Sequence, residues 1–495
     1  MNLVSTGFII FISIFILAYY TIFRRFQWQF LLLVSYLVYT YVNPINLVFL
    51  LITSLSTYYT AIYIDTAPPS PCVKKRVLII AIVLNFAMLG LFKYSGFIVG
   101  DSIFVRIAQP LGISFYIFQS MGYLIDVYRK KFPAQRNIFK FALFVSYFPQ
   151  LIQGPIGRWD KLANQLFESR DLDYDNLKYG LQLALWGYFK KIMISDRAAI
   201  VVNSIFSDYT SYPGAMVFLS VLFYGIQIYG DFSGGIDIVR GISQMLGIKM
   251  SINFRQPFFA TSIANFWRRW HITLGTWLKD YVFFPLNFSK PLAKLNRAGR
   301  KALGAKWGKH ISITISTFII YFIVGIWHGA GFKYMAFGIW NGTIISISNI
   351  LAPNYAKAKS RLGISDDDRW YRLFMIIRTN ILVAIGRFFT RAPGFMVAVS
   401  MIGHSFSNFN IGQVNMDMFR GLGLSSENWL ILFVSIGILL IVDYAGEKGL
   451  DLRKVLEEKS FATNLAVILA SVSFFIVYVI YAAGYIPTDF IYQQF

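Results

Sequence analysis

"ISITISTFIIYFIVGIWHGAGF", residues 311 to 332, is an apolar run that ends in a histidine, His328, among three glycines. A helix that begins near residue 310 carries His328 about 27 Å along its axis, at ~1.5 Å per residue. The hydrocarbon core of a bilayer is about 30 Å thick. The stretch therefore predicts a transmembrane helix with an ionisable side chain deep in the membrane, toward its far side.

Similar apolar runs recur along the whole chain. Of its 495 residues, 56% are hydrophobic and only 14% are charged, whereas soluble domains carry about 25% charged residues. We predict an all-α polytopic integral membrane protein with roughly 11–14 hydrophobic segments in a single domain, residues 1–495. The apolar windows lie near 3–23, 29–64 with a break at Pro44, 77–100, 108–127, 138–155, 177–206, 214–236, 311–327, 330–351, 373–391, 395–409, 429–445 and 464–486.

The net charge of +22 follows from short basic clusters between the apolar runs. This pattern is typical of cytoplasmic loops rather than of a nucleic-acid-binding surface. The run from Lys290 to Lys309 holds seven Lys or Arg and no acid, and it predicts a cytoplasmic loop. The single cysteine, Cys72, excludes an intramolecular disulfide and a thiolate metal cluster. We expect the chain to lie in a lipid bilayer and to bind neither nucleic acid nor a metal.

The middle segment "NFRQPFFATSIANFWRRWHITLGTWLKDYVFFPL", residues 253 to 286, is too polar to face lipid throughout. We expect it at the membrane interface or along a water-filled cavity, with Trp267, Trp270 and Trp277 serving mainly as interfacial anchors. Two arginines, at 268 and 269, precede His271. They either bind an anionic ligand or mark the cytoplasmic boundary, and both readings stay open.

The histidines lie in different sequence surroundings, and these predict different roles for them. An ionisable side chain at membrane depth is a functional candidate by default, which applies to His328. The glycines around it, at 325, 329 and 331, either allow close helix packing or leave room for a substrate. His310 is expected to be solvated, and His404 is expected to have a structural role.

Several acids lie in or beside apolar runs. Asp126 and Asp196 have basic neighbours, so we expect ion pairs there. Asp231 and Asp237 accompany three glycines between 230 and 235, which predict a break in a helix. At such a break the two acids would orient a histidine or arginine, or tie the break together.

The chemistry open to such a histidine is limited. The sequence has no HExxH, P-loop or dinucleotide-binding motif. A neutral imidazole is a natural general base for a hydroxyl nucleophile. Acyl transfer to an alcohol fits this residue set, and a proton-coupled transporter remains an alternative.

Several longer blocks carry a family resemblance. The chain resembles the membrane-bound O-acyltransferase (MBOAT) family, in the bacterial branch of the alginate O-acetyltransferase membrane subunit. The matching blocks are "PLGISFYIFQSMGYLIDVYR" at 110–129, "FPQLIQGPIGRW" at 148–159, "YGIQIYGDFSGGIDIVRGISQMLGIKMSINFRQPF" at 224–258, "FWRRWHITLGTWLKDYVFFPL" at 266–286, "GIWHGAGFKYMAFGIWNG" at 325–342 and the terminal "DFIYQQF".

The resemblance implies the MBOAT fold, a ring of transmembrane and re-entrant helices around a central tunnel. It implies that His328 is the catalytic histidine, that His271 is the second family histidine, and that a cytoplasmic acyl donor enters nearby. Candidate donor-binding residues are Arg268, Arg269 and Trp267, and candidate supporting residues are Asp126, Asp231, Trp327 and Asn341. Asn341 stands where relatives often have a histidine, and Gln493 stands where an aromatic residue is common.

The implied activity is an O-acyltransferase of the bacterial cytoplasmic membrane. It would move an acyl group, expected to be acetyl, from a thioester such as acetyl-CoA to an extracytoplasmic polysaccharide or cell-wall glycan, with a separate extracytoplasmic acetyltransferase as partner and no tightly bound cofactor. The alternatives are D-alanyl transfer toward teichoic acid and a non-catalytic acyl conduit or transporter. Tyr492, the fourth residue from the C-terminal end, is either a transient acyl acceptor in a relay or part of a packing terminus.

Overall fold

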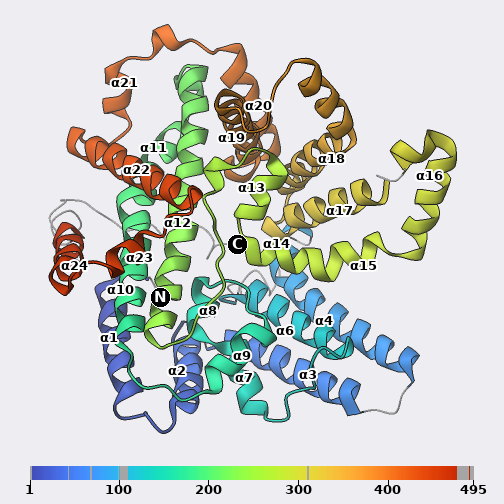
Figure 1. The fold of residues 1–495 in the computed structure, drawn as a ribbon, viewed down its shortest axis with the longest axis vertical. Coiled ribbons are helices and arrows are strands. Elements are labelled where there is room, and N and C mark those ends of the chain that lie inside the picture. The colour runs from blue at the N-terminus through green and yellow to red at the C-terminus, as the bar shows by residue number, and fades with distance from the viewer. Residues whose placement is uncertain are drawn as a thin grey trace. The chain divides into compact units, whose positions relative to one another are not determined.

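The computed structural model describes residues 3–42, 44–66, 70–98, 100, 110–308, 311–475 and 490, and these fold into helices and connecting segments (Figure 1). They divide into two compact units. Unit 1 comprises residues 1–192, 230–252 and 453–495, and unit 2 comprises residues 193–229 and 253–452.

Unit 1 contains helices from both ends of the chain. They are α1 (Thr6–Tyr20), α2 (Gln27–Val42), α3 (Asn46–Thr66), α4 (Pro71–Ile98), α6 (Ile113–Tyr128), α7 (Ile138–Ser146), α8 (Phe148–Gln153), α9 (Trp159–Phe167), α10 (Tyr174–Tyr188) and α24 (Phe461–Phe475). Three elements have residues in both units: the π-helix η1 (Phe189–Ser195), α12 (Gly214–Met245) and α23 (Leu452–Glu457).

Unit 2 contains the elements of the polar middle segment and most of the later apolar helices. They are α11 (Asp196–Ser207), η2 (Tyr209–Ser211), η3 (Pro257–Phe259), α13 (Ile263–Arg269), α14 (Ile272–Leu278), η4 (Lys279–Phe283), α15 (Phe284–Asn287), α16 (Lys290–Gly308), α17 (Ile311–His328), α18 (Phe332–Arg361), α19 (Arg369–Arg391), α20 (Phe395–Ser407), η5 (Ile411–Gln413), α21 (Met416–Gly421) and α22 (Ser426–Glu447).

Seven helices among the described residues are long and apolar enough to cross a membrane: α3, α4, α12, α17, α18, α19 and α22. Four shorter apolar helices accompany them, at Thr6–Tyr20, Ile138–Gln153, Phe395–Ser407 and Phe461–Ser473. The predicted class, an all-helical multi-pass membrane protein, is confirmed, as is the interruption at Pro44 between α2 and α3. The single domain, the ring of helices and its tunnel stay predictions.

In unit 2, α17 and α18 form a closely packed antiparallel pair. A Cβ atom on Gly325 would lie 2.9 Å from the Cα of Gly338, and one on Gly342 would lie 3.2 Å from the Phe318 ring. The two backbones therefore approach each other where side chains are missing, as small residues allow in membrane helices. Residue numbers rise along α17 as their partners fall along α18, which makes the pair antiparallel.

A glycine seam in unit 1 contradicts the predicted helix break near Asp231. Helix α12 runs without interruption from Gly214 to Met245. A Cβ on Gly234 would lie 2.8 Å from the Gly187 carbonyl oxygen of α10, and one on Gly241 would meet the Gly180 carbonyl. The glycines thus serve close packing between α10 and α12, and the hydrogen bonds of the helix continue through them.

The prediction of a loop at 290–309 is also wrong, because residues 290–308 form the helix α16. Only Gly304, at φ 81° and ψ 163°, interrupts it. Its described basic side chains are exposed while Leu292 is buried. Asn296 bonds the side chain and the backbone N–H of Ser312 at 2.7 and 3.0 Å, which ties α16 to the first turn of α17.

We expect Gly325→Ala to lower the melting temperature of the detergent-solubilised protein, because the new methyl group collides with the α18 backbone at a cost of ~1–3 kcal/mol. Gly437→Ala on α22 is the matched control, since nothing lies within 4 Å of the site of its Cβ. Differential scanning fluorimetry compares the two, and equal melting temperatures would show that the close approach is not required.

Candidate active site

His328 is the last residue of α17, as the sequence predicts. Its side chain is 6% exposed and lies in an aromatic surrounding. The Trp327 and Phe337 rings meet the imidazole edge-on, with centroids at 5.0 and 5.3 Å, a favourable arrangement for aromatic pairs. The imidazole is therefore held in place by apolar contacts from both α17 and α18.

The glycines around His328 have different roles. Gly325 packs against α18, and a Cβ on Gly329 would collide with the Tyr334 ring, so these two positions leave no room for a ligand. Gly331 is different, because nothing lies within 4 Å of where its Cβ would be. Its φ of 124° is a conformation that glycine adopts readily. Of these three positions, only Gly331 has open space where a side chain would stand.

His271 lies in the left-handed region, at φ 46° and ψ 52°, between α13 and α14. It is 2% exposed. The Oδ1 atom of Asn253 accepts hydrogen bonds from Thr273 N at 2.9 Å and Oγ1 at 2.8 Å. The amide nitrogen of Asn253 is then left to donate to His271 Nδ1, 3.2 Å away. This pairing places the proton of a neutral His271 on Nε2.

Trp327 connects the two histidines. Its ring centroid is 5.6 Å from the His271 imidazole and 5.0 Å from the His328 imidazole. The indole is 7% exposed. One buried indole therefore separates the two rings that the sequence singles out.

A second contact joins the middle segment to α18. Trp267 Nε1 donates to Asn341 Oδ1 at 3.0 Å, and the Asn341 amide donates to the Phe337 carbonyl at 2.8 Å. The Phe337 ring contacts both Trp267 and His328. Five predicted residues, His271, His328, Trp327, Trp267 and Asn341, thus belong to one cluster in unit 2. We call it the histidine cluster.

The two arginines before His271 have different surroundings. Arg269 forms a bidentate ion pair with Glu447, at 2.5 and 3.2 Å, and Arg372 joins the same carboxylate at 2.8 Å. Arg268 is exposed. Trp270 is buried at 4% exposure rather than placed as an interfacial anchor, and the same holds for Trp277.

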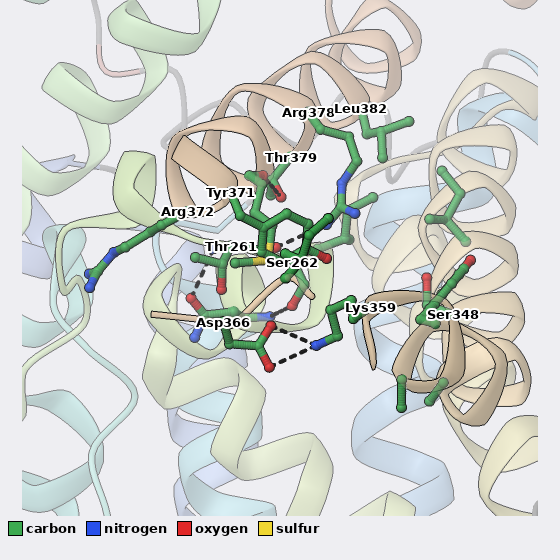
Figure 2. Close-up of a pocket in the computed structure, with 18 of the residues that line it drawn as sticks. Thr261, Ser262, Ser348, Lys359, Asp366, Tyr371, Arg372, Arg378, Thr379 and Leu382 are labelled. Atoms are coloured by element: carbon green, nitrogen blue, oxygen red, sulfur yellow. Dashed lines mark hydrogen bonds and ion pairs between the residues drawn. The ribbon is translucent and has the colours of Figure 1, made fainter. Parts of the chain in front are cut away.

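A pocket of about 920 Å³ lies between the start of α13, the second half of α18 and the first half of α19. Apolar side chains such as Ile344 and Leu382 form part of its wall. Figure 2 shows Lys359 and Asp366 facing each other. The Lys359 Nζ atom lies 2.6 and 2.7 Å from the two carboxylate oxygens of Asp366. Figure 2 also shows Arg378, which donates to the Thr261 carbonyl at 3.0 Å.

Arg378 is the most distinctive charged group of this pocket. Its Nε atom is buried and has no hydrogen-bond partner within the described ranges. A buried guanidinium N–H without a partner is costly, and an anion bound in the pocket would satisfy it. The sequence offered no signal for Arg378, because its pocket forms only after three helices pack.

Helix α18 links the pocket to the histidine cluster. At ~1.5 Å per residue, Ile344 lies about 10 Å along α18 from Phe337, and Lys359 lies about 33 Å from it. Because α17 and α18 are antiparallel, the charged end of α18 returns to the side on which α17 begins. The pocket therefore extends from the charged end of α18 toward His328.

Three of the four predicted acidic residues lie in ion pairs within unit 1, and the pair expected at Asp196 in unit 2 stays a prediction. Asp126 bonds Lys131 at 3.2 Å, which confirms the expected pair. Asp231 bonds Lys191 at 2.7 Å. Asp237 bonds Lys190 at 2.7 Å and also pairs with Arg240. The sequence alone does not predict that Lys190 and Lys191 pair with these acids, although two adjacent lysines in "WGYFKKIMIS" are as unusual in an apolar run as the acids are.

His404 has the expected structural role, because its Nε2 atom forms a hydrogen bond of 2.8 Å with the Tyr212 carbonyl oxygen. His310, Tyr492 and Gln493 lie outside the described residues.

A model of the MBOAT, membrane-bound O-acyltransferase family matches residues 126–298. The chain is 32% identical over 431 residues to a probable alginate O-acetylase AlgI of Pseudomonas putida, which covers 84% of this chain and 83% of the relative. It is 31% identical over 371 residues to a peptidoglycan O-acetyltransferase of Helicobacter pylori, covering 68% and 67%. It is 24% identical over 280 residues to a teichoic acid D-alanyltransferase of Bacillus subtilis, covering 56% and 67%.

The matched region contains the whole middle segment with His271, and the alignment to the first relative extends over most of the chain. Together with the helical spans, these similarities identify the chain: it belongs to the membrane-bound O-acyltransferase family and is a multi-pass membrane O-acyltransferase.

Proposed function

We propose that this enzyme moves an acetyl group from a cytoplasmic thioester, such as acetyl-CoA, across the membrane for O-acetylation of an extracytoplasmic polysaccharide or cell-wall glycan. The names of its relatives support this acceptor class. The observation that carries the proposal is the buried His328 at the end of a membrane span, joined to His271 through Trp327. Among the alternatives, D-alanyl transfer toward teichoic acid has the lower sequence similarity.

His328 is the general base of the transfer. The imidazole takes the proton of the acceptor hydroxyl, whose oxygen forms a bond to the thioester carbonyl carbon. The carbon–sulfur bond then breaks, and the thiol leaves with the proton that the imidazole returns. Such base catalysis contributes about 10²- to 10⁴-fold in rate. The open space at Gly331 is where the reacting groups meet the ring.

His271 acts through Trp327 as a positioning residue. Burial lowers the pKa of His271 to about 3, so this ring is neutral at physiological pH. Its bond to Asn253 fixes the ring, and the ring supports one face of the indole that contacts His328. The reacting imidazole is thereby held in one orientation, which favours a productive geometry.

The pocket beside α18 binds the donor. Its half-buried Arg378 and the charged end of α18 suit the phosphate groups of a nucleotide thioester. Its apolar wall suits the arm that carries the acyl group. Since α16 is basic and precedes α17, this end of α18 is on the cytoplasmic side. Arg269 supports the pocket through Glu447 rather than by binding the donor directly.

Onward transfer uses a relay. Tyr492 is the first acyl acceptor, its hydroxyl attacks the thioester with His328 as base, and the tyrosyl ester then passes its acetyl group to a separate extracytoplasmic acetyltransferase. The enzyme itself needs no tightly bound cofactor in this scheme.

We expect His328→Ala to lower thioester cleavage by about 10²- to 10⁴-fold, because the base is removed. The measurement is thiol release from labelled acetyl-CoA by the purified protein. His404→Gln is the control, since His404 serves the backbone at Tyr212, and it is expected to keep full activity. Cleavage that survives His328→Ala would show a conduit whose histidines do no chemistry.

We expect Arg378→Ala to raise the KM for acetyl-CoA on the order of 10- to 100-fold with little change in kcat, because one charge-assisted contact to the donor is lost. Arg420→Ala removes an exposed arginine of α21 and is the matched control. Steady-state kinetics provide both constants. A KM equal to that of the unaltered enzyme would place the donor elsewhere.

The stability of the enzyme is expected to fall as the pH drops from 7 to 5. A histidine in the unfolded chain has a pKa near 6.5, whereas buried His271 stays neutral in the folded protein. Proton binding below pH 7 therefore stabilises the unfolded chain relative to the folded one. This residue alone accounts for about 2 kcal/mol over that range. Thermal unfolding of His271→Gln should show a smaller loss between these pH values, and an identical loss would contradict the buried neutral state.

A further inference from the structure

An arginine of α19 is buried inside unit 2. Arg387 lies four residues before the end of α19, which is a candidate membrane span, and it is 7% exposed. A basic side chain near the end of a span ordinarily extends toward the water at the membrane surface. An arginine that turns into the protein instead is costly, and such residues commonly serve function. Neither the base nor the donor pocket of the proposed reaction uses this group.

A glycine of α12 makes room for the guanidinium group. A Cβ atom on Gly225 would collide with the Nη1 atom of Arg387 and would lie 3.0 Å from its Cζ atom. The three atoms nearest to that Cβ all belong to Arg387. Because glycine has no side chain, the guanidinium lies directly against the α12 backbone at this position.

Three aromatic rings lie around the same guanidinium group. The Cζ atom of Arg387 is 5.7 Å from the ring centroids of Phe266 and Trp270 and 6.0 Å from that of Phe258. The Phe266 and Trp270 rings are buried and stack on each other, with centroids 5.4 Å apart. A cation is attracted to ring faces at such distances, most strongly where both are removed from water. The arginine therefore contacts both members of one buried stacked pair.

The first member of the stacked pair adjoins the histidine cluster. Trp267, which follows Phe266, donates to Asn341 of α18. The residue before Arg387 reaches the same asparagine, because a Cβ atom on Gly386 would lie 3.7 Å from the Asn341 amide nitrogen. Helices α13 and α19 thus both meet α18 at Asn341, and Arg387 joins these two helices.

The second member of the stacked pair directly precedes His271. The φ angle of His271 is 46°, in a region that residues other than glycine seldom occupy. Such a conformation persists where the surrounding contacts hold it. Asn253 holds the imidazole at Nδ1, and Arg387 holds Trp270, the residue before it.

We propose that Arg387 is a positioning residue for acyl transfer, which holds residues 266–271 in place. His271 and Trp267 of this segment then keep the imidazole of His328 in its reactive orientation. This proposal rests on the base role proposed for His328. A guanidinium group suits the task because it is flat, always charged and able to stack on aromatic rings.

Thiol release from labelled acetyl-CoA tests the positioning role. Arg387→Met keeps the length of the side chain and removes the planar charge. We expect kcat to fall by about 10- to 100-fold, because a small displacement misaligns the base. The KM for acetyl-CoA is expected to stay within about twofold, since Arg387 lies outside the donor pocket. Arg387→Lys keeps the charge without the planar group and should recover part of kcat.

Arg391→Met is the matched control, one turn further along α19. Arg391 also lies over a ring, with its Cζ atom 5.3 Å from the Phe206 centroid, and its loss is expected to leave both constants unchanged. An unaltered kcat in Arg387→Met, or an equal loss in Arg391→Met, would overturn the positioning role. A raised KM with normal kcat would also overturn it, because the arginine would then serve the donor.

Gly225→Ala tests the same contact from α12. The added methyl group displaces the guanidinium, so kcat is expected to fall by about tenfold. In an Arg387→Ala background the methyl group meets no guanidinium, and the same change should alter kcat by no more than about twofold. Equal effects in the two backgrounds would overturn the proposal. If the arginine variants do not fold, an unchanged kcat in Gly225→Ala alone is enough to do so.

Hydrogen–deuterium exchange of the full-length protein in detergent separates this inference from the proposed chemistry. Arg387→Met is expected to raise exchange in the peptide that contains residues 266–273 by about tenfold, and Arg391→Met is expected to leave it unchanged. If thioester cleavage survives His328→Ala, the proposed base is lost, whereas raised exchange would still support the hold of Arg387 on this segment. Unchanged exchange would overturn that hold, and raised exchange with normal kcat would overturn its part in catalysis.

Discussion

The close approach of α17 and α18 at Gly325 and Gly338 is the constraint on which the site depends. Lipid tails are as apolar as leucine, so packing rather than hydrophobic burial holds such helices together. With the two backbones in contact, Phe337 of α18 reaches the His328 ring and Asn341 reaches Trp267. A wider separation would leave the imidazole without its α18 contact, and the histidine cluster would lose its connection to the pocket.

The aromatic surrounding of His328 also matters for chemistry. A thioester is hydrolysed when water reaches the activated carbonyl, so a site that excludes water protects the acyl group until the intended hydroxyl arrives. Trp327 and Phe337 pack edge-on against the His328 ring and are themselves buried, an arrangement that suits such exclusion and restricts the orientation of the ring. In the proposed mechanism, the same side chains would both restrict which nucleophile reacts and align the base.

Hydropathy predicted all seven candidate spans of the described residues, because apolar length is a local property of the sequence, although the predicted runs at 108–127 and 177–206 are not among those spans. The depth of His328 followed from counting residues along one helix, and the Asp126–Lys131 pair from neighbours five residues apart. Contacts between distant residues were not predictable in this way: Lys191 meets Asp231 across 40 residues and Arg269 meets Glu447 across 178. The predicted helix break near Asp231 is wrong for the same reason. Only the helix that packs against such glycines shows whether they break their own helix or allow a close helix–helix contact.

Each unit contains a glycine seam beside a buried polar group. In unit 1 the Gly187–Gly234 contact stands next to the Lys191–Asp231 pair, and in unit 2 the Gly325 contact stands one turn from His328. A polar group at membrane depth needs a partner within a few ångströms, and ordinary helix spacing of 8–10 Å leaves side chains to bridge the gap. Glycine removes that gap. The small residues are therefore part of how this enzyme keeps charged and titratable groups inside an apolar environment, rather than an incidental feature of its helices.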